Sequence, residues 1–183
     1  TFGIAATTFT GQNVGARRLD RVQQGAKDIL LLGLGVSTAL TVCILLFGRQ
    51  LMNVFTQTDE IVSYGVSMLR ILAVGYIAFS VSQTLTGVMR GAGETVIPMW
   101  ISVITTVVIR MPIAYLWAYL TRSPAFPNGD PACLYGSLLI AWLLGCAMTS
   151  AVYVKGKWKR KCSWDEVMAA ANDTEADPEG GNA

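Results

Sequence analysis

The chain has 183 residues and a formal net charge of +2, and only 14% of its residues are charged, whereas charged residues make up about 25% of an average soluble domain. So few charges cannot cover a water-soluble surface, and because apolar stretches consume most of the chain, a separate soluble catalytic domain is excluded. The sequence has no histidine and therefore lacks the commonest metal ligand and the usual acid or base near neutral pH, so we expect no enzyme, no metal site and no cofactor.

The first element in chain order is the opening run TFGIAATTFTG. It is uncharged and rich in small residues, and it lacks the basic start of a signal peptide. We interpret this run as the end of a membrane helix that begins before Thr1. The chain is therefore expected to be a fragment of a longer protein whose N-terminal part is missing.

Four membrane spans are predicted after this opening run. A helix crosses the hydrocarbon core of a bilayer with about 20 residues at a rise of about 1.5 Å each. The sequence predicts an all-α, polytopic membrane helix bundle with spans at about residues 29–48, 61–89, 96–120 and 132–154. We expect residues 1–161 to form the membrane region and residues 162–183 to form a short cytoplasmic tail that is largely disordered.

Lysine and arginine are distributed unequally between the two ends of these spans. Ten of the 14 lie before the first span, after the second or after the fourth, whereas the opposite connections contain only Arg49 and Arg122. Because cytoplasmic loops retain positive charge, we expect a multi-pass protein of the cell membrane with a cytoplasmic C-terminus. This small and asymmetric charge gives no reason to expect a nucleic-acid partner.

Polar side chains recur at helical spacing in the second predicted span. Tyr76, Ser80, Gln83 and Gly87 form one stripe on a background of Ile, Val, Leu and Phe. Such a stripe lines a cavity or makes hydrogen bonds between helices. Helix-to-helix bonding is favoured for Ser80, and both interpretations stay open for Gln83, whose amide needs several partners.

The third predicted span contains an arginine well inside the apolar stretch. Ser102, Thr106 and Arg110 follow one another at intervals of four residues. A guanidinium at that depth costs several kcal/mol unless it faces water or a partner. It faces a cavity or bonds to backbone carbonyls, of which Pro112 frees one at Val108. We propose Tyr76, Gln83 and Arg110 as substrate-cavity residues, with substrate contact left to Tyr76 and Gln83.

Small residues line one face of the first and fourth spans and predict close helix packing. These residues are Gly33, Ser37 and Thr41 in the first span, and Ser137, Ala141, Gly145 and Thr149 in the fourth. Gly87 and Gly91 also form a G-x-x-x-G pattern. Its meaning as a dimerisation face is doubtful, because the pattern runs out of the membrane.

Two segments are more specific than the composition: TGQNVGARRLDRV at residues 10–22 and LTGVMRGAGETVIPM at residues 85–99. Both resemble the multidrug and toxic compound extrusion (MATE) family. In that family a G-Q-x-x-G-A loop followed by basic residues, and an R-G-x-G-[DE]-T-x-x-P segment, lie on the cytoplasmic face. The matching residues here are Gly11, Gln12, Gly15, Ala16, Arg90, Gly91, Gly93, Glu94, Thr95 and Pro98.

The resemblance implies that the chain is most of the second six-helix half of a twelve-helix transporter: four complete helices and the end of a preceding one. By that resemblance the intact protein is a secondary antiporter that exports organic, often cationic, drugs or toxins in exchange for protons or sodium ions by alternating access. Its implied partners are these small molecules, the coupling cation, membrane lipid and the N-terminal half of the same protein. All 12 Asp and Glu residues lie outside the spans, so a coupling carboxylate is expected in the missing part.

Two other functions remain open from the sequence. One is a lipid-linked oligosaccharide flippase, which also needs cations inside the membrane to hold phosphates. The other is a nontransporting membrane assembly subunit that acts through the small-residue faces of the first and fourth spans. Arg110 alone does not decide between transport of drugs and transport of lipid-linked sugars.

Overall fold

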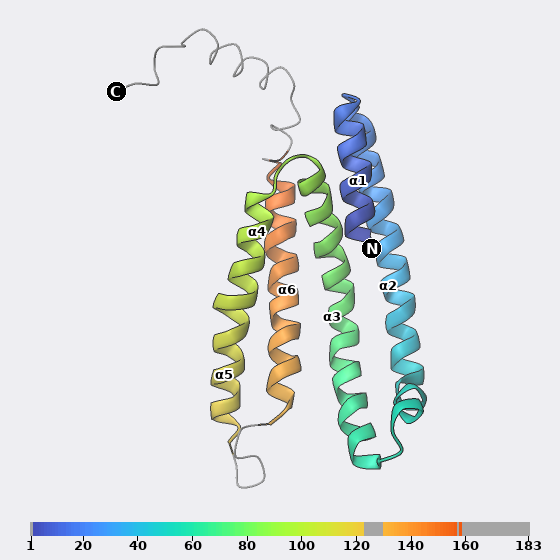
Figure 1. Cartoon of the computed structure of the whole chain (residues 1–183), viewed down its shortest axis with the longest axis vertical. Coiled ribbons are helices and arrows are strands. Elements are labelled where there is room, and N and C mark those ends of the chain that lie inside the picture. The colour runs from blue at the N-terminus through green and yellow to red at the C-terminus, as the bar shows by residue number, and fades with distance from the viewer. Residues whose placement is uncertain (1, 123–129, 157, 159–183) are drawn as a thin grey trace, which may run out of the picture.

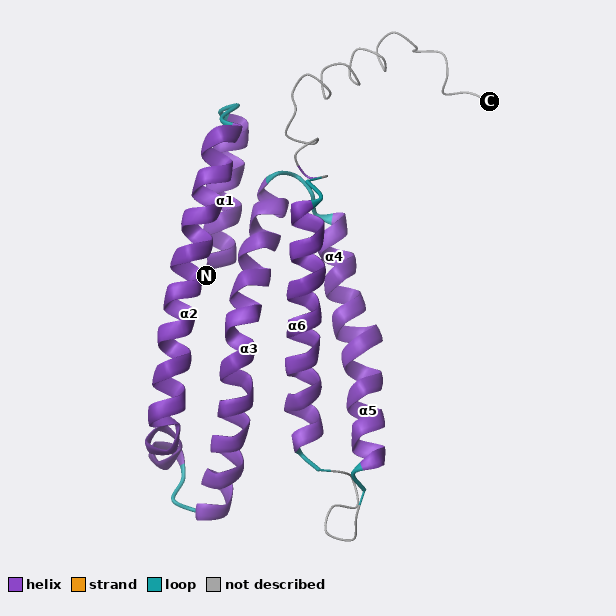
Figure 2. Ribbon diagram, turned by 180° about the vertical axis from the view of Figure 1, so that it is seen from behind, coloured by secondary structure: helices purple, strands orange, loops and turns teal. Residues whose placement is uncertain are grey.

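The computed structural model describes residues 2–122, 130–156 and 158, which form a bundle of antiparallel helices (Figure 2). The predicted all-α fold class is confirmed, while the predicted tail at residues 162–183 lies outside the described residues. The helical elements are α1 (Phe2–Gly15), α2 (Leu19–Phe55), α3 (Asp59–Gly91), α4 (Val96–Val103), the π-helix η1 (Ile104–Arg110), α5 (Met111–Leu120) and α6 (Ala132–Val154).

Four helical stretches are long and apolar enough to cross a membrane, which makes the chain a multi-pass membrane protein. They are Leu19–Phe55, Asp59–Gly91, Val96–Leu120 and Ala132–Val154. The first two run past the predicted apolar limits at both ends, and acidic residues, which are favourable in the first turn of a helix, lie at their N-terminal ends. Asp20 lies in the first turn of α2, and Asp59 and Glu60 lie in the first turn of α3.

Helix α3 occupies the middle of the bundle, with α1 and α2 on one side and α6 with the α4–α5 span on the other (Figure 1). The turns at residues 16–18 and 92–95 lie at the same end as the last turn of α6, and we call this the motif end. The last turns of α2 and α5 and the first turns of α3 and α6 lie at the opposite end. Both segments that carry the sequence motifs are therefore brought together by the antiparallel order of the helices.

The motif end contains an apolar cluster built from residues of several helices. Trp158, which is 2% exposed, stacks on Tyr153 with ring centroids 5.2 Å apart, and its indole N–H donates to the Tyr153 carbonyl at 3.1 Å. The indole thus satisfies its polar group while its ring is buried. The other buried members are Ala6, Val22, Ala26, Val88, Met89 and Ala92.

Helices α1 and α3 approach each other closely along a line of glycines, which we call the glycine seam. A Cβ atom on Gly91 would lie 2.5 Å from the carbonyl oxygen of Thr7, and one on Gly87 would clash with the carbonyl of Gly3. Gly11 faces the Gly91 carbonyl across the same seam. The G-x-x-x-G pattern of α3 therefore packs against α1 within the chain.

The turn between α3 and α4 explains three residues of the second motif. Gly93 has a φ of +84°, a conformation that glycine adopts without steric cost. Glu94 is buried, and its Oε1 accepts the backbone N–H of Ile97 at 3.2 Å. Pro98 is the third residue of α4, where a helix has no carbonyl to pair with an N–H.

The other matched residues are in or beside regular helix at the motif end. Gln12 is exposed in α1, and its carbonyl accepts the N–H of Ala16 at 3.0 Å, just after α1 ends at Gly15. Thr95 directly precedes α4, and its carbonyl accepts the N–H of Met99 at 3.2 Å.

The predicted small-residue faces are packed except at Ser37, which is half-buried. Ser137, Ala141, Gly145 and Thr149 are all buried along α6. In α2, Gly33 and Thr41 are buried, and the Thr41 hydroxyl donates to the Ala73 carbonyl of α3 at 2.8 Å. These close contacts leave the larger apolar side chains of α2 facing outward, as expected for a helix in lipid.

Candidate functional site

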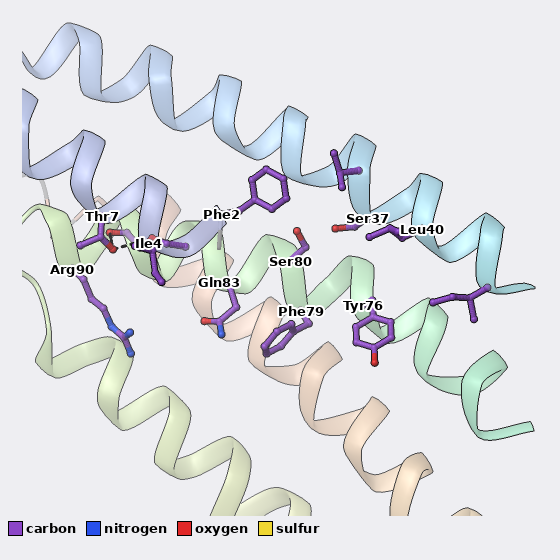
Figure 3. Close-up of a pocket in the computed structure, with 14 residues that line it drawn as sticks. Phe2, Ile4, Thr7, Ser37, Leu40, Tyr76, Phe79, Ser80, Gln83 and Arg90 are labelled. Carbon is purple, nitrogen blue, oxygen red and sulfur yellow. Dashed lines mark hydrogen bonds between the residues drawn. The ribbon is translucent and has the colours of Figure 1, made fainter. Parts of the chain in front are cut away.

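A groove of about 600 Å³ runs along α3 between α1 and α2, and we call it the main groove (Figure 3). This volume lies within the range of about 300–1,000 Å³ that is typical of sites for drug-sized ligands. Helix α1 walls the half of the groove nearer the motif end (Figure 1). The groove is lined by Phe2, Gly3, Ile4, Thr7, Val36, Ser37, Leu40, Ile44, Tyr76, Phe79, Ser80, Gln83, Gly87 and Arg90.

The main groove combines aromatic and aliphatic side chains with a few polar groups. The ring centroids of Tyr76 and Phe79 lie 5.5 and 5.1 Å from that of Trp142 in α6. Trp142 therefore packs against both rings. Among the described residues that line the groove, Arg90 alone carries a charge. No three His, Cys, Asp or Glu side chains among the described residues gather into a metal-binding group.

All four members of the predicted α3 stripe line the main groove, but they differ in their contacts. The Ser80 hydroxyl faces the Gly33 carbonyl of α2 at 3.4 Å, which agrees with the favoured helix-to-helix interpretation. Gly87 belongs to the glycine seam. Gln83 is exposed and makes no side-chain hydrogen bond within the described residues. Its amide is therefore open to the groove.

A second cavity of about 140 Å³ lies between α3, α6 and the α4–η1 span, and we call it the hydroxyl cavity. Phe79, Gln83 and Arg90 line both this cavity and the main groove. The two spaces therefore share a wall. The remaining lining consists of Ser82, Thr86, Pro98, Ile101, Ser102, Thr105, Thr106, Ala141, Trp142, Gly145 and Thr149.

The hydroxyl groups of this cavity fall into two sets. Ser82 and Thr149 bond to each other at 3.3 Å, and Thr105 bonds to the Ile101 carbonyl at 2.8 Å. The hydroxyls of Thr86, Ser102 and Thr106 make no hydrogen bond within the described residues. Because a polar group in an apolar slab is costly without a partner, this second set is suited to water or a ligand.

Arg110 lies at the end of η1 and is half-buried, and it lines neither cavity. Ser102 and Thr106 do line the hydroxyl cavity. The sequence predicted a straight α-helical stripe, whereas residues 104–110 are π-helical. A π-helix bonds residue i to i+5 and so changes the phase of the side chains that follow. The assignment of Arg110 to one cavity with Tyr76 and Gln83 stays a prediction.

Arg90 was predicted only as part of a loop motif, yet its side chain reaches from the last turn of α3 toward α4 beside both cavities (Figure 3). The sequence does contain a pattern that indicates Arg90 as a lining residue. Tyr76, Gln83 and Arg90 are spaced seven residues apart, which is close to two helical turns. Extending the polar stripe by one more step leads to Arg90.

The chain is similar to a known protein family and to several known proteins. Residues 1–116 match the family described as MatE. The chain is 25% identical over 163 residues to the probable multidrug resistance protein YoeA of Bacillus subtilis, covering 88% of this chain and 33% of that protein. It is 24% identical over 170 residues to multidrug and toxin extrusion protein 1 of Mus musculus, covering 92% of this chain and 29% of that one.

The fold is also similar to a solved structure. The crystal structure of the eukaryotic MATE transporter AtDTX14 matches with a TM-score of 0.77 at 18% identity, over 91% of this chain and 36% of that one. The chain spans about a third of the length of the curated relatives that it matches.

Proposed function

Since this chain belongs to the MatE family, we propose that it forms one wall of the substrate pathway in a secondary transporter that exports organic compounds. The observation that carries this proposal is the main groove, whose size and mixed aromatic and polar lining suit a drug-sized molecule. We also propose that this export is coupled to an exchange with protons or sodium ions, as the family resemblance implies.

Substrate contact is assigned to Tyr76 and Gln83. The Tyr76 ring offers a flat apolar surface with a hydroxyl at its edge, and the Gln83 amide offers donors and an acceptor. Neither residue makes a side-chain hydrogen bond within the described part of the chain, so both are available to a ligand. Arg110 is assigned to shaping the pathway or to pairing with a carboxylate on helices outside this chain.

Alternating access requires an opposing wall that moves relative to this one. The main groove is open along α3, and its described lining contains no carboxylate. The proposal therefore places the opposing wall and the coupling carboxylate on helices that this chain does not supply. The motif end, which is rich in Lys and Arg, is assigned to the cytoplasm.

The test uses Tyr76→Ala and Gln83→Ala in the complete transporter, together with Arg110→Gln. The measurement is the efflux rate of a fluorescent organic cation from cells, divided by the amount of transporter in the membrane. Losing a packed ring or a well-placed hydrogen bond should slow efflux by about tenfold, since a tenfold change corresponds to about 1.4 kcal/mol. Tyr115→Ala is the matched control, because Tyr115 is exposed on α5 and lines neither cavity.

The control variant should keep efflux within about twofold of the unmodified protein, because surface substitutions rarely change free energies by more than about 0.5 kcal/mol. Unchanged efflux in both the Tyr76 and Gln83 variants contradicts the groove assignment. For Arg110→Gln, a parallel fall in abundance and efflux points to a structural role. Loss of efflux at normal abundance supports its role in the pathway.

A further inference from the structure

We propose that Arg90 forms an oxyanion subsite where the main groove and the hydroxyl cavity meet, and that this subsite holds the carboxylate or phosphate of an amphiphilic molecule. The inference rests on the proposed function and adds a substrate class to it. The rest of the molecule would occupy the aromatic part of the main groove.

The position of Arg90 is the first support. Its side chain extends from the last turn of α3 toward α4 and lines both spaces (Figure 3). Arg90 is exposed, but unlike an arginine that only reaches outward to headgroups, it also borders both cavities. A ligand in the main groove that extends toward the motif end reaches this guanidinium.

The balance of charge is the second support. The described lining of both cavities contains no Asp or Glu, and Arg90 is its only charged residue. Arg90 forms no ion pair with a described carboxylate. Glu94, the acidic residue nearest to it in the sequence, is instead a cap for α4 through the Ile97 amide. The local charge therefore favours an anion over a cation.

Uncharged donors near Arg90 are the third support. Thr86 lies one helical turn before Arg90, and Ser102 and Thr106 of the α4–η1 span line the same hydroxyl cavity as Arg90. These hydroxyls and the Gln83 amide make no side-chain hydrogen bond within the described residues. Hydroxyl and amide donors around a guanidinium are the groups that hold carboxylate and phosphate oxygens in proteins.

The volumes of the two cavities match the two parts of such a ligand, a small anionic group and a larger apolar body. The hydroxyl cavity, at about 140 Å³, has room for a carboxylate or phosphate group but not for a drug-sized body. The main groove, at about 600 Å³, has room for that body beside Tyr76 and Phe79. The shared residues Phe79, Gln83 and Arg90 lie where the two parts of the ligand join.

The test compares two dyes that differ by one charge: a rhodamine with a free carboxylate and its ethyl ester. Binding of each dye to the purified complete transporter in detergent is measured by fluorescence anisotropy. Arg90→Gln should weaken binding of the acid by about tenfold, which corresponds to about one charge-assisted hydrogen bond, and should leave the ester within about twofold. Arg90→Lys should recover part of the loss, because lysine keeps the charge but not the two-pronged geometry.

The matched control is Arg49→Gln, because Arg49 is an exposed arginine at the opposite end of the bundle and lines neither cavity. It should leave the binding of both dyes unchanged. A second arm places the transporter in vesicles of zwitterionic lipid with and without anionic phospholipid. If the anion is a lipid phosphate, Arg90→Gln abolishes the effect of anionic phospholipid on transport of the ester, and acid binding in detergent is unchanged.

Three results distinguish the inference from the proposed function. Selective loss of acid binding, or selective loss of the lipid effect, supports the oxyanion subsite and identifies its source. Equal behaviour of the unmodified and Arg90→Gln proteins in both arms overturns the subsite, while ester transport keeps the proposed function. An unmodified protein that neither binds nor transports either dye overturns both.

Discussion

The side-chain hydroxyl of Thr7 in α1 donates a hydrogen bond to the backbone carbonyl of Gly87 in α3 at 3.1 Å, and it also lies 2.9 Å from the Gly3 carbonyl in its own helix. A side-chain hydroxyl reaches the backbone of a neighbouring helix only where the two helices are very close. Gly3 and Gly87 permit this approach, because neither has a Cβ atom. The glycine seam thus combines backbone contact with an interhelical hydrogen bond.

Gly87→Ala is expected to destabilise the protein. The added methyl group would meet the Gly3 carbonyl, which is backbone and cannot rotate away, so a cost of about 1–3 kcal/mol is expected from overpacking. Thermal unfolding of the purified transporter in detergent measures it. Gly35→Ala is the control, because Gly35 is also helical but a methyl group added there would meet no described atom within 4 Å; equal unfolding temperatures for the two variants would contradict the role of the seam.

Thr10→Val is expected to stabilise the protein by about 1 kcal/mol, because a buried hydroxyl without a partner carries an uncompensated desolvation cost. Thr10 is fully buried, and its hydroxyl makes no hydrogen bond among the described residues. Thr41→Val makes the same chemical change where the hydroxyl bonds to Ala73, and it should cost about 0.5–1 kcal/mol. The prediction fails if both variants shift the unfolding temperature in the same direction.

The assignment of the motif end to the cytoplasm predicts the labelling of single cysteines. In a background without the four native cysteines, a membrane-impermeant maleimide applied to intact cells should modify Thr58→Cys but not Lys155→Cys. Thr58 precedes α3 at the opposite end, and Lys155 follows α6 at the motif end. Permeabilised cells are the control, since both positions should then react. Labelling of only Lys155→Cys in intact cells would reverse the orientation.

Expression of residues 1–183 alone is expected to give cells no resistance to toxic organic compounds. Alternating access needs two walls between which the pathway opens, and the main groove has one wall in this chain. The measurement is the growth of cells on a panel of toxic dyes, with membrane insertion of the chain verified by fractionation. Resistance at a level similar to that of the complete transporter would contradict this expectation.

The helices and their order were predictable because the signal is simple: apolar stretches of membrane length separated by short polar turns. The loop motifs were also informative, because Gly93 must adopt a positive φ and Pro98 must lie in the first turn of a helix. Tyr76 and Gln83 were singled out from their helical spacing; both line the main groove, and their contact with a substrate stays a prediction.

Other features depended on partners that a single sequence does not reveal. The G-x-x-x-G pattern of Gly87 and Gly91 does not indicate which helix packs against it. The structure shows that this helix is α1. Arg90 was assigned only to a loop motif, and its place beside two cavities follows from the packing of α3 against α4 and α6. The π-helix before Pro112 has no spacing signature, so the phase of Arg110 was not predictable.

The two longest outer spans differ in mechanical stiffness. Helix α2 is α-helical without interruption over 37 residues, and its last turns bend aside from its straight main length (Figure 1). A tilt of about 10° displaces the end of a straight helix about 40 Å long by about 7 Å. The span from α4 to α5 contains the π-helical turns of η1 and then Pro112, which interrupt the regular ladder of backbone bonds and give it a compliant joint. We expect α2 to move as a lever and the α4–α5 span to bend, so a rocking motion of the bundle would deform the wall of the hydroxyl cavity more than it deforms the outer side of the main groove.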